Sequence, residues 1–62
     1  MKIKDFLENY DGICNITIKD RSDYSEHNYR HKDEAIRNYG YFSIKNWVID
    51  NNNIIIYIQS QF

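Results

Sequence analysis

The stretch Trp47-Val48-Ile49-Asp50-Asn51-Asn52-Asn53-Ile54-Ile55-Ile56-Tyr57-Ile58 decides the fold of this chain. It spans the end of one run rich in β-branched and aromatic residues, Tyr41–Asp50, and the whole of a second, Ile54–Ile58. Three asparagines separate the two runs. This arrangement predicts two strands joined by a turn. Because the second run is apolar at every position, it favours a central strand that is covered on both faces. In a chain of 62 residues, few other elements remain to cover it.

Two short helices are predicted outside this hairpin. Ile3–Tyr10 places its apolar side chains on one helix face, and Asp11-Gly12 ends the helix. The apolar residues of that face are Ile3, Phe6, Leu7 and Tyr10. His31–Tyr39 is the second helix, with Asn28 as a candidate N-cap and Gly40 at its end. Its inner side carries Ala35, Ile36 and Tyr39.

A third strand is predicted between the helices. Ile13–Lys19 alternates between apolar and polar residues, with Cys14, Ile16 and Ile18 on its inner face. Asp20–Arg30 is polar and charged, and we interpret it as a loop or as an edge strand over part of its length. The chain therefore predicts a single α+β domain, residues 1–62. Its two short helices would pack on one face of a three-stranded, mainly antiparallel sheet, in the order helix, strand, helix, strand, strand.

The second face of this sheet predicts self-association. On the strand Tyr41–Asp50, Phe42, Ile44 and Val48 share one face, and Tyr41, Trp47 and Ile49 share the other. The uncovered face would then carry an apolar patch of Tyr41, Trp47, Ile49, Ile55 and Tyr57. Such patches usually mark interfaces, so we expect a homodimer through Tyr41, Trp47, Ile49 and Tyr57. In the alternative, the Asp20–Arg30 segment folds over this face.

Composition narrows the classes of function. Eight Lys and Arg against nine Asp and Glu give a net charge of −1, which argues against a general nucleic-acid binder and against an acidic DNA mimic. The single cysteine, Cys14, excludes an internal disulfide. No stretch has the length and apolar character of a signal peptide or a membrane span, so we expect a cytoplasmic protein with no membrane partner.

No catalytic, metal or nucleotide signature stands out, so we expect neither an enzyme nor a cofactor. His27 and His31 are four residues apart, and with Asp23, Glu26 or Glu34 they would form a metal site only if a helix began that early. Solvated polar residues are the favoured interpretation. Cys14 lies on the face assigned to the core and is interpreted as a small buried hydrophobe. The acidic residues near position 20 alternate with basic ones and predict a solvated surface.

Tyrosine and arginine suggest an interaction surface. Four tyrosines surround the polar segment and the second helix, close to two arginines, and these residue types are enriched at protein-interaction hot spots. We predict a partner-binding site of Tyr24, Glu26, Tyr29, Arg30 and Arg37. The same aromatic residues are able to stack on bases of single-stranded nucleic acid. The charge balance favours a protein partner.

The stretch Tyr39-Gly40-Tyr41-Phe42-Ser43-Ile44-Lys45-Asn46-Trp47, followed by Asn51–Ile58, resembles the C-terminal half of many short phage and mobile-element proteins of low-GC Gram-positive bacteria. Such proteins often begin with a helix like Ile3–Tyr10 and a cysteine-containing strand like Asp11–Ile18. The resemblance rests on a pattern of strand and turn residues over most of the chain.

This resemblance implies a class of role and assigns no residue. It implies a stoichiometric inhibitor of host defence, such as an anti-CRISPR protein, or a modulator of a host enzyme. We therefore expect a protein that binds a host protein, for example a CRISPR effector, and inhibits it by steric occlusion. A small nucleic-acid-binding or transcription-regulating module is the alternative.

Overall fold

The computed structural model describes residues 1–10 and 15–61 and shows an α+β fold. Its elements are α1 (Ile3–Glu8), β1 (Asn15–Asp20), β2 (Glu26–Tyr29), α2 (Lys32–Tyr39), β3 (Asn46–Asp50) and β4 (Asn53–Ile58). The predicted fold class and the two helices are confirmed, but the sheet has four strands rather than three. The expectations for Asp11, Gly12, Ile13 and Cys14 lie outside the described residues.

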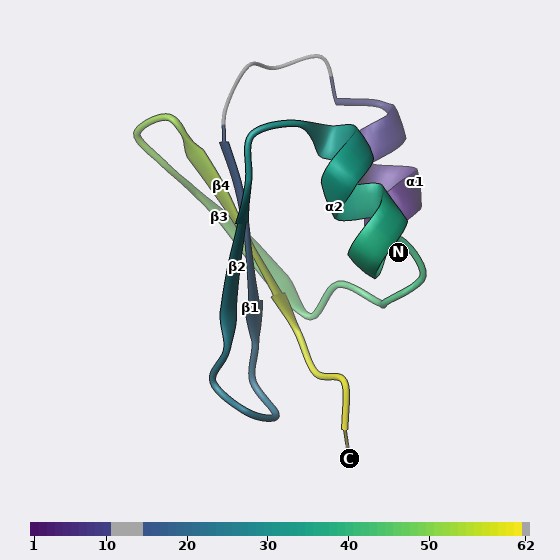
Figure 1. Ribbon diagram of the computed structural model, residues 1–62, viewed down its shortest axis with the longest axis vertical. Helices are drawn as coiled ribbons and strands as arrows, with labels where there is room; N and C mark the ends of the chain where they lie inside the picture. The colour runs from purple at the N-terminus through teal and green to yellow at the C-terminus, as the bar shows by residue number, and fades with distance from the viewer. Residues whose placement is uncertain (11–14, 62) are drawn as a thin grey trace.

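The sheet consists of two antiparallel hairpins, β1–β2 and β3–β4. The first strand, β1, pairs with the last strand, β4, and joins the two hairpins into one sheet. The strand order is β2-β1-β4-β3, so β1 and β4 lie in the centre and run parallel (Figure 1). The expected central position of Ile54–Ile58 is confirmed. The additional strand, β2, comes from the polar Asp20–Arg30 segment, in which a partial edge strand was one of two interpretations. An edge strand with a solvated face needs few apolar residues, which explains its weak signal in the sequence.

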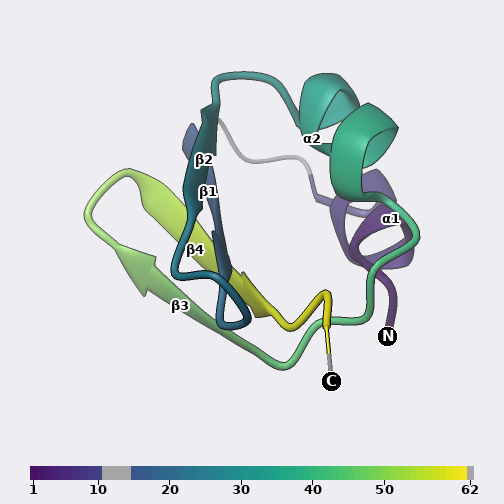
Figure 2. The ribbon, with the colours of Figure 1, turned by 60° about the horizontal axis from the view of Figure 1, so that its bottom comes forward.

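Both helices cover the same face of the sheet (Figure 2). The buried core lies between the two layers and consists of Ile3, Leu7, Ile16, Ile18, Ala35, Ile54, Ile56 and Ile58. Seven further apolar residues pack against this core while remaining partly exposed, Phe6, Tyr10 and Ile36 among them. The predicted inner faces of both helices and of the first strand are confirmed for the described residues. β2 extends the sheet sideways next to β1, so it does not fold over the second face.

The third strand is shorter than predicted. β3 begins at Asn46 rather than Tyr41, because Phe42 and Ile44 hydrogen-bond to the N-terminal segment, and contact with β4 begins only where the Lys45 N–H donates to the Tyr57 carbonyl. The Ile3 N–H donates to the Phe42 carbonyl over 3.0 Å, and the Ile44 N–H donates to the Met1 carbonyl over 2.9 Å. Phe42 and Ile44 therefore pack against the core from this connecting segment.

The interruption before Asn46 also reverses the predicted faces of β3. Trp47 lies opposite Ile56 and Ile49 lies opposite Ile54, so both side chains are on the helix-covered side. Val48 lies opposite Ile55, on the uncovered side. The prediction that Trp47 and Ile49 lie on the uncovered face is therefore wrong. It counted a regular alternation from Tyr41 onward, whereas the strand starts five residues later.

The ends of α2 are set by close backbone contacts. His31 is the N-cap residue, and Asn28 lies in β2, so the expected cap at Asn28 is wrong. Gly40 is the C-cap, as predicted, but it has right-handed dihedral angles. Its N–H donates to the Ile36 carbonyl over 2.8 Å, and an added Cβ would overlap that carbonyl oxygen. The position therefore leaves no room for a side chain.

Candidate functional site

The face of the sheet that no described helix covers changes character from one edge to the other. The first cross-strand row, Val48, Ile55, Thr17 and Asn28, runs from an apolar to a polar end. The second row is Asn46, Tyr57, Lys19 and Glu26. The Thr17 hydroxyl donates to Asn28 Oδ1 over 2.8 Å, which satisfies a polar group that is otherwise buried. The polar half of this face therefore carries its hydrogen-bonding and charged groups.

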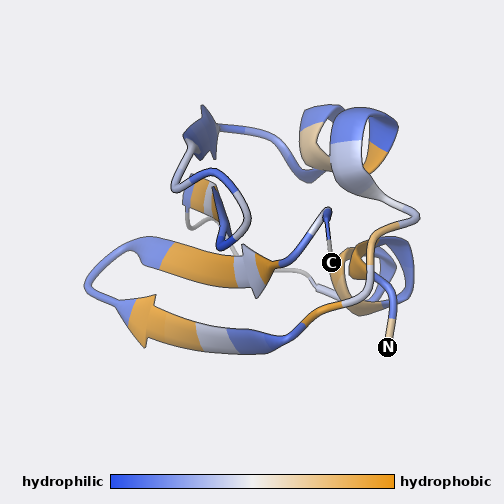
Figure 3. Cartoon of the chain, turned by 90° about the horizontal axis from the view of Figure 1, so that it is seen from below, coloured by the Kyte–Doolittle hydropathy of each residue, from blue (hydrophilic) through white to orange (hydrophobic). Residues whose placement is uncertain are grey.

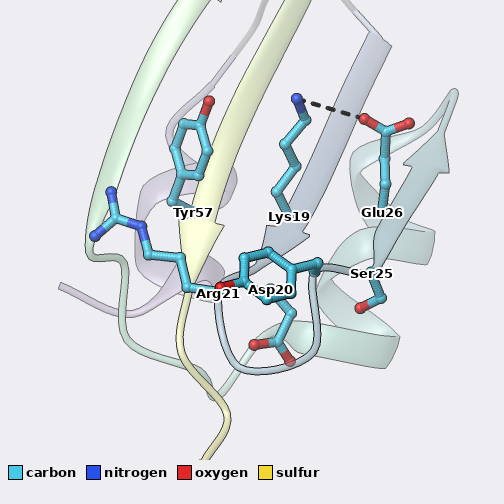
Figure 4. Close-up of a pocket in the computed structure, with 7 residues that line it drawn as sticks. Lys19, Asp20, Arg21, Ser25, Glu26 and Tyr57 are labelled. Carbon is cyan, nitrogen blue, oxygen red and sulfur yellow. Dashed lines mark ion pairs between the residues drawn. The ribbon is translucent and has the colours of Figure 1, made fainter.

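A hollow of about 320 Å³ lies at the end of this face, where β1 turns into β2 (Figure 4). It is lined by Lys19, Asp20, Arg21, Tyr24, Ser25, Glu26 and Tyr57. Residues from β1, β2, β4 and the turn between β1 and β2 therefore meet here. We call this set the turn site.

The turn that carries Tyr24 is built by two short-range side-chain bonds. Asp20 Oδ1 accepts the Ser22 N–H over 2.8 Å, and Asp23 Oδ1 accepts the Ser25 N–H over 2.9 Å. Such bonds two residues apart mimic a backbone turn. Between them, Tyr24 has a φ of 60° and is 92% exposed. A bulky aromatic residue in this left-handed conformation is a backbone outlier that the surrounding structure must hold in place.

Two cations flank the Tyr57 ring. The Arg21 guanidinium carbon lies 5.2 Å from the ring centroid, and Lys19 Nζ lies 6.0 Å from it. The Arg21 N–H donates to the Ile58 carbonyl over 2.8 Å, which fixes the start of this side chain beside β4. Lys19 Nζ lies 3.6 Å from Glu26 Oε1, so one cation has a carboxylate neighbour (Figure 4). Within residues 1–10 and 15–61, no carboxylate forms an ion pair with Arg21.

Asp20 fastens the turn site to the segment after β4. Its carboxylate accepts hydrogen bonds from the Ser60 hydroxyl, the Ser60 N–H and the Ser22 N–H. These bonds, above all the one from the Ser60 hydroxyl, hold the pKa of Asp20 below its ordinary value. The Ser22 hydroxyl donates to the Gln61 carbonyl over 3.0 Å and accepts the Gln61 N–H over 2.7 Å. The turn is thus hydrogen-bonded to Ser60 and Gln61, in the segment that follows β4.

The structure divides the predicted partner-binding residues among four places. Tyr24 and Glu26 both line the turn site. Tyr29 lies on the helix side, where its ring is 6.4 Å from that of Tyr39. Arg30 lies beyond the far end of β2, and Arg37 is exposed on α2, in the helix layer. The five residues therefore do not form one surface.

The predicted self-association residues are also divided. Tyr57 lines the turn site, whereas Trp47 and Ile49 lie on β3. Tyr41 lies outside the sheet, 76% exposed, with Lys2 Nζ and Lys4 Nζ at 5.6 and 5.8 Å from its ring centroid. Lys19 and Arg21 were missed as site residues. Only Lys19 had a signal in the sequence: the alternation of the first strand places its side chain on the face away from the core-facing isoleucines.

The two histidines do not share a helix face. His27 lies in β2, with its ring 5.1 Å from that of Tyr39, and His31 caps α2. The metal site that was the less favoured interpretation required both histidines on one helix, and this condition is not met. Across residues 1–10 and 15–61, no three His, Cys, Asp or Glu side chains are grouped to hold a metal ion. In the same ranges, no helix has the length and apolar character needed to cross a membrane.

The turn site combines an exposed tyrosine, an arginine that forms no ion pair among the described residues and a hollow beside both. These are groups for recognition: the guanidinium is able to bind a carboxylate with two parallel hydrogen bonds, and the aromatic rings supply rigid contact area. Comparison of the chain with protein-family models, curated proteins and solved structures gives no significant match.

Proposed function

We propose that this chain is a binding module that inhibits a partner protein by covering part of its surface, with the turn site at the centre of the contact. The observation that carries this proposal is Tyr24, which is 92% exposed in a strained backbone conformation beside Arg21. Strain of this kind persists where the structure holds a side chain in place, and it clusters at binding sites. Tyr and Arg are the residues that most often dominate binding energy.

The chemistry of the site indicates what the partner presents. Arg21 stacks beside Tyr57 and would bind an acidic side chain, while Tyr24 would enter an apolar recess. The resemblance to phage and mobile-element proteins supports a host protein as the partner, a CRISPR effector among the candidates. Compared with the site expected from the sequence, this proposal keeps Tyr24 and Glu26 and adds Arg21.

The first experiment is a pulldown from a lysate of a low-GC Gram-positive host that carries CRISPR systems, with and without nuclease, read by mass spectrometry. The expected result is one dominant protein that survives nuclease treatment. Tyr24→Ala and Arg21→Ala should each weaken its binding by about 10-fold or more, as expected for hot-spot residues.

Matched controls are available in the same chain. Tyr41→Ala removes another exposed tyrosine, which lies outside the sheet, and Arg37→Ala removes an arginine from the helix layer. Neither should change the affinity, and circular dichroism should show that all four variants fold. If Arg37→Ala weakens binding as much as Arg21→Ala, the contact is not centred on the turn site.

A nucleic-acid-binding or transcription-regulating module is the second candidate. The pair of cations beside Tyr57 favours it, since bases stack on aromatic side chains and phosphates meet cations. The ion pair between Lys19 and Glu26 counts against it, because it neutralises half of that charge. Binding to single-stranded DNA or RNA that weakens steeply with salt would support this candidate. Absence of any gel shift at low salt would remove it.

A further inference from the structure

The outer edge of β3 is the least protected part of the sheet. β3 is the last strand in the sheet order, and every one of its residues is exposed. Trp47, Val48 and Ile49 are 47, 40 and 61% exposed, and apolar residues occupy both strands of this hairpin (Figure 3). Natural edge strands are usually protected by lysine, proline or very short length. The other edge, β2, has four residues and is mostly polar, whereas β3 carries neither lysine nor proline.

The hairpin turn determines which backbone groups of β3 face outward. Asp50 lies opposite Asn53, and the two residues between them form the turn, with Asn51 at a φ of 55°. The closing pair of a two-residue hairpin is hydrogen-bonded, and such pairs alternate along the ladder. Trp47 and Ile49 therefore direct their N–H and C=O groups away from β4. In agreement, the Trp47 N–H donates to Asn46 Oδ1 over 2.9 Å.

This pattern is self-complementary, and we propose that two copies of this chain pair antiparallel through β3, with Val48 on the two-fold axis. In that register, Trp47 lies opposite Ile49 of the second copy, and the outward N–H and C=O groups of the two strands meet each other. Aromatic and β-branched residues opposite one another stabilise antiparallel strands. Asn46 would meet Asp50, so no like charges face each other. The two four-stranded sheets become one continuous sheet.

A hollow beside Trp47 supports a second copy as the occupant. It measures about 350 Å³ and is lined by Met1, Phe6, Ile44, Lys45, Asn46 and Trp47. The Phe6 and Trp47 rings are 5.5 Å apart, so α1 supports the indole from behind. In the proposed register, Ile49 of the second copy lies over Trp47 at the rim of this hollow. Each copy thus supplies both the exposed isoleucine and the surface that covers it.

Mass and fluorescence measured against concentration test this dimer. Light scattering should give twice 7.6 kDa at high micromolar concentration and 7.6 kDa on dilution. Trp47 is the only tryptophan, so its emission should shift to longer wavelength over the same range of dilution. Ile49→Lys should raise the dissociation constant at least 10-fold. Tyr41→Lys adds the same charge and removes an exposed apolar group outside the sheet, so it should leave the constant unchanged.

Amide hydrogen exchange of the unmodified protein gives a second, independent test in case Ile49→Lys does not fold. The Ile49 amide should exchange slowly in concentrated samples and at least 10-fold faster after dilution, whereas the Ile56 amide should stay protected. A mass of 7.6 kDa at high micromolar concentration would overturn the proposal. So would a dimer in which the Ile49 amide exchanges equally fast at both concentrations, or one that Tyr41→Lys disrupts. The turn site lies at another part of the sheet, so the pulldown result does not depend on this outcome.

Discussion

Replacing Asp20 by alanine should destabilise the protein far more than the equivalent change at Asp23, although both carboxylates build the same turn. Asp20 is only 6% exposed and accepts three hydrogen bonds, from Ser22 and Ser60. Asp23 is exposed and accepts one backbone N–H, from Ser25. The comparison isolates the attachment of the turn to the segment after β4.

The size of the effect follows from those bonds. A hydrogen bond to a charged group contributes about 1.5–3 kcal/mol. The donors of Ser22 and Ser60 lie near the surface and would partly regain water, so we expect a net loss of about 2–4 kcal/mol rather than the full sum. A domain of this length is stabilised by roughly 3–9 kcal/mol in total. Asp20→Ala would therefore remove a large share of the free energy of unfolding.

Urea unfolding followed by circular dichroism measures this loss. With a slope of about 1 kcal/mol per molar urea, the midpoint of Asp20→Ala should fall by about 2 M or more. If that variant is unfolded in buffer, Asp20→Asn retains one acceptor oxygen and should lie between it and the unmodified protein. Equal midpoints for Asp20→Ala and Asp23→Ala would refute the reasoning.

Three further predictions concern stability. The pKa of Asp20 is lowered in the folded state, so the stability that this carboxylate contributes is complete above its unfolded pKa of about 3.9 and is lost as the pH falls through its folded pKa. Melting temperatures should therefore drop below pH 4, and Ser60→Ala should make that drop smaller. Gly40→Ala should lower the melting temperature measurably, because its Cβ would overlap the Ile36 carbonyl oxygen; an unchanged value would contradict the assigned contact. Ile18→Ala should cost about 2–5 kcal/mol in urea unfolding, since this side chain is fully buried.

The sequence predicted those parts of the fold that depend on local periodicity. The inner faces of Ile3–Glu8 and Lys32–Tyr39 and the central position of Ile54–Ile58 follow from the spacing of apolar residues. The break in the strand before Asn46 could not be predicted in this way, because it results from hydrogen bonds to Met1 and Ile3, far away in the chain. Since faces alternate with every residue, one misplaced strand start was enough to reverse Trp47 and Ile49.

The candidate site was predicted only in part, for a similar reason. Tyr24 and Glu26 were chosen because of their residue types, and both line the turn site. Arg21 is positioned by a hydrogen bond from its backbone N–H to the Ile58 carbonyl, and Tyr57 lines the same hollow because β1 pairs with β4. Neither contact leaves a local pattern in the sequence.

The parallel pairing of β1 and β4 has a consequence for the order in which the protein can fold. Asn15 lies opposite Asn53 and Asp20 lies opposite Ile58. Each residue of β1 is therefore 38 positions away in the sequence from the residue of β4 that lies opposite it. Pairing at such separations makes folding slow, because a long loop must close before any contact is gained. During synthesis, β1 has only β2 beside it until β4 has been made. Ile16 and Ile18 then lack their β4 neighbours, so we expect a nascent chain that ends before Ile54 to expose these side chains rather than to form a partly folded domain.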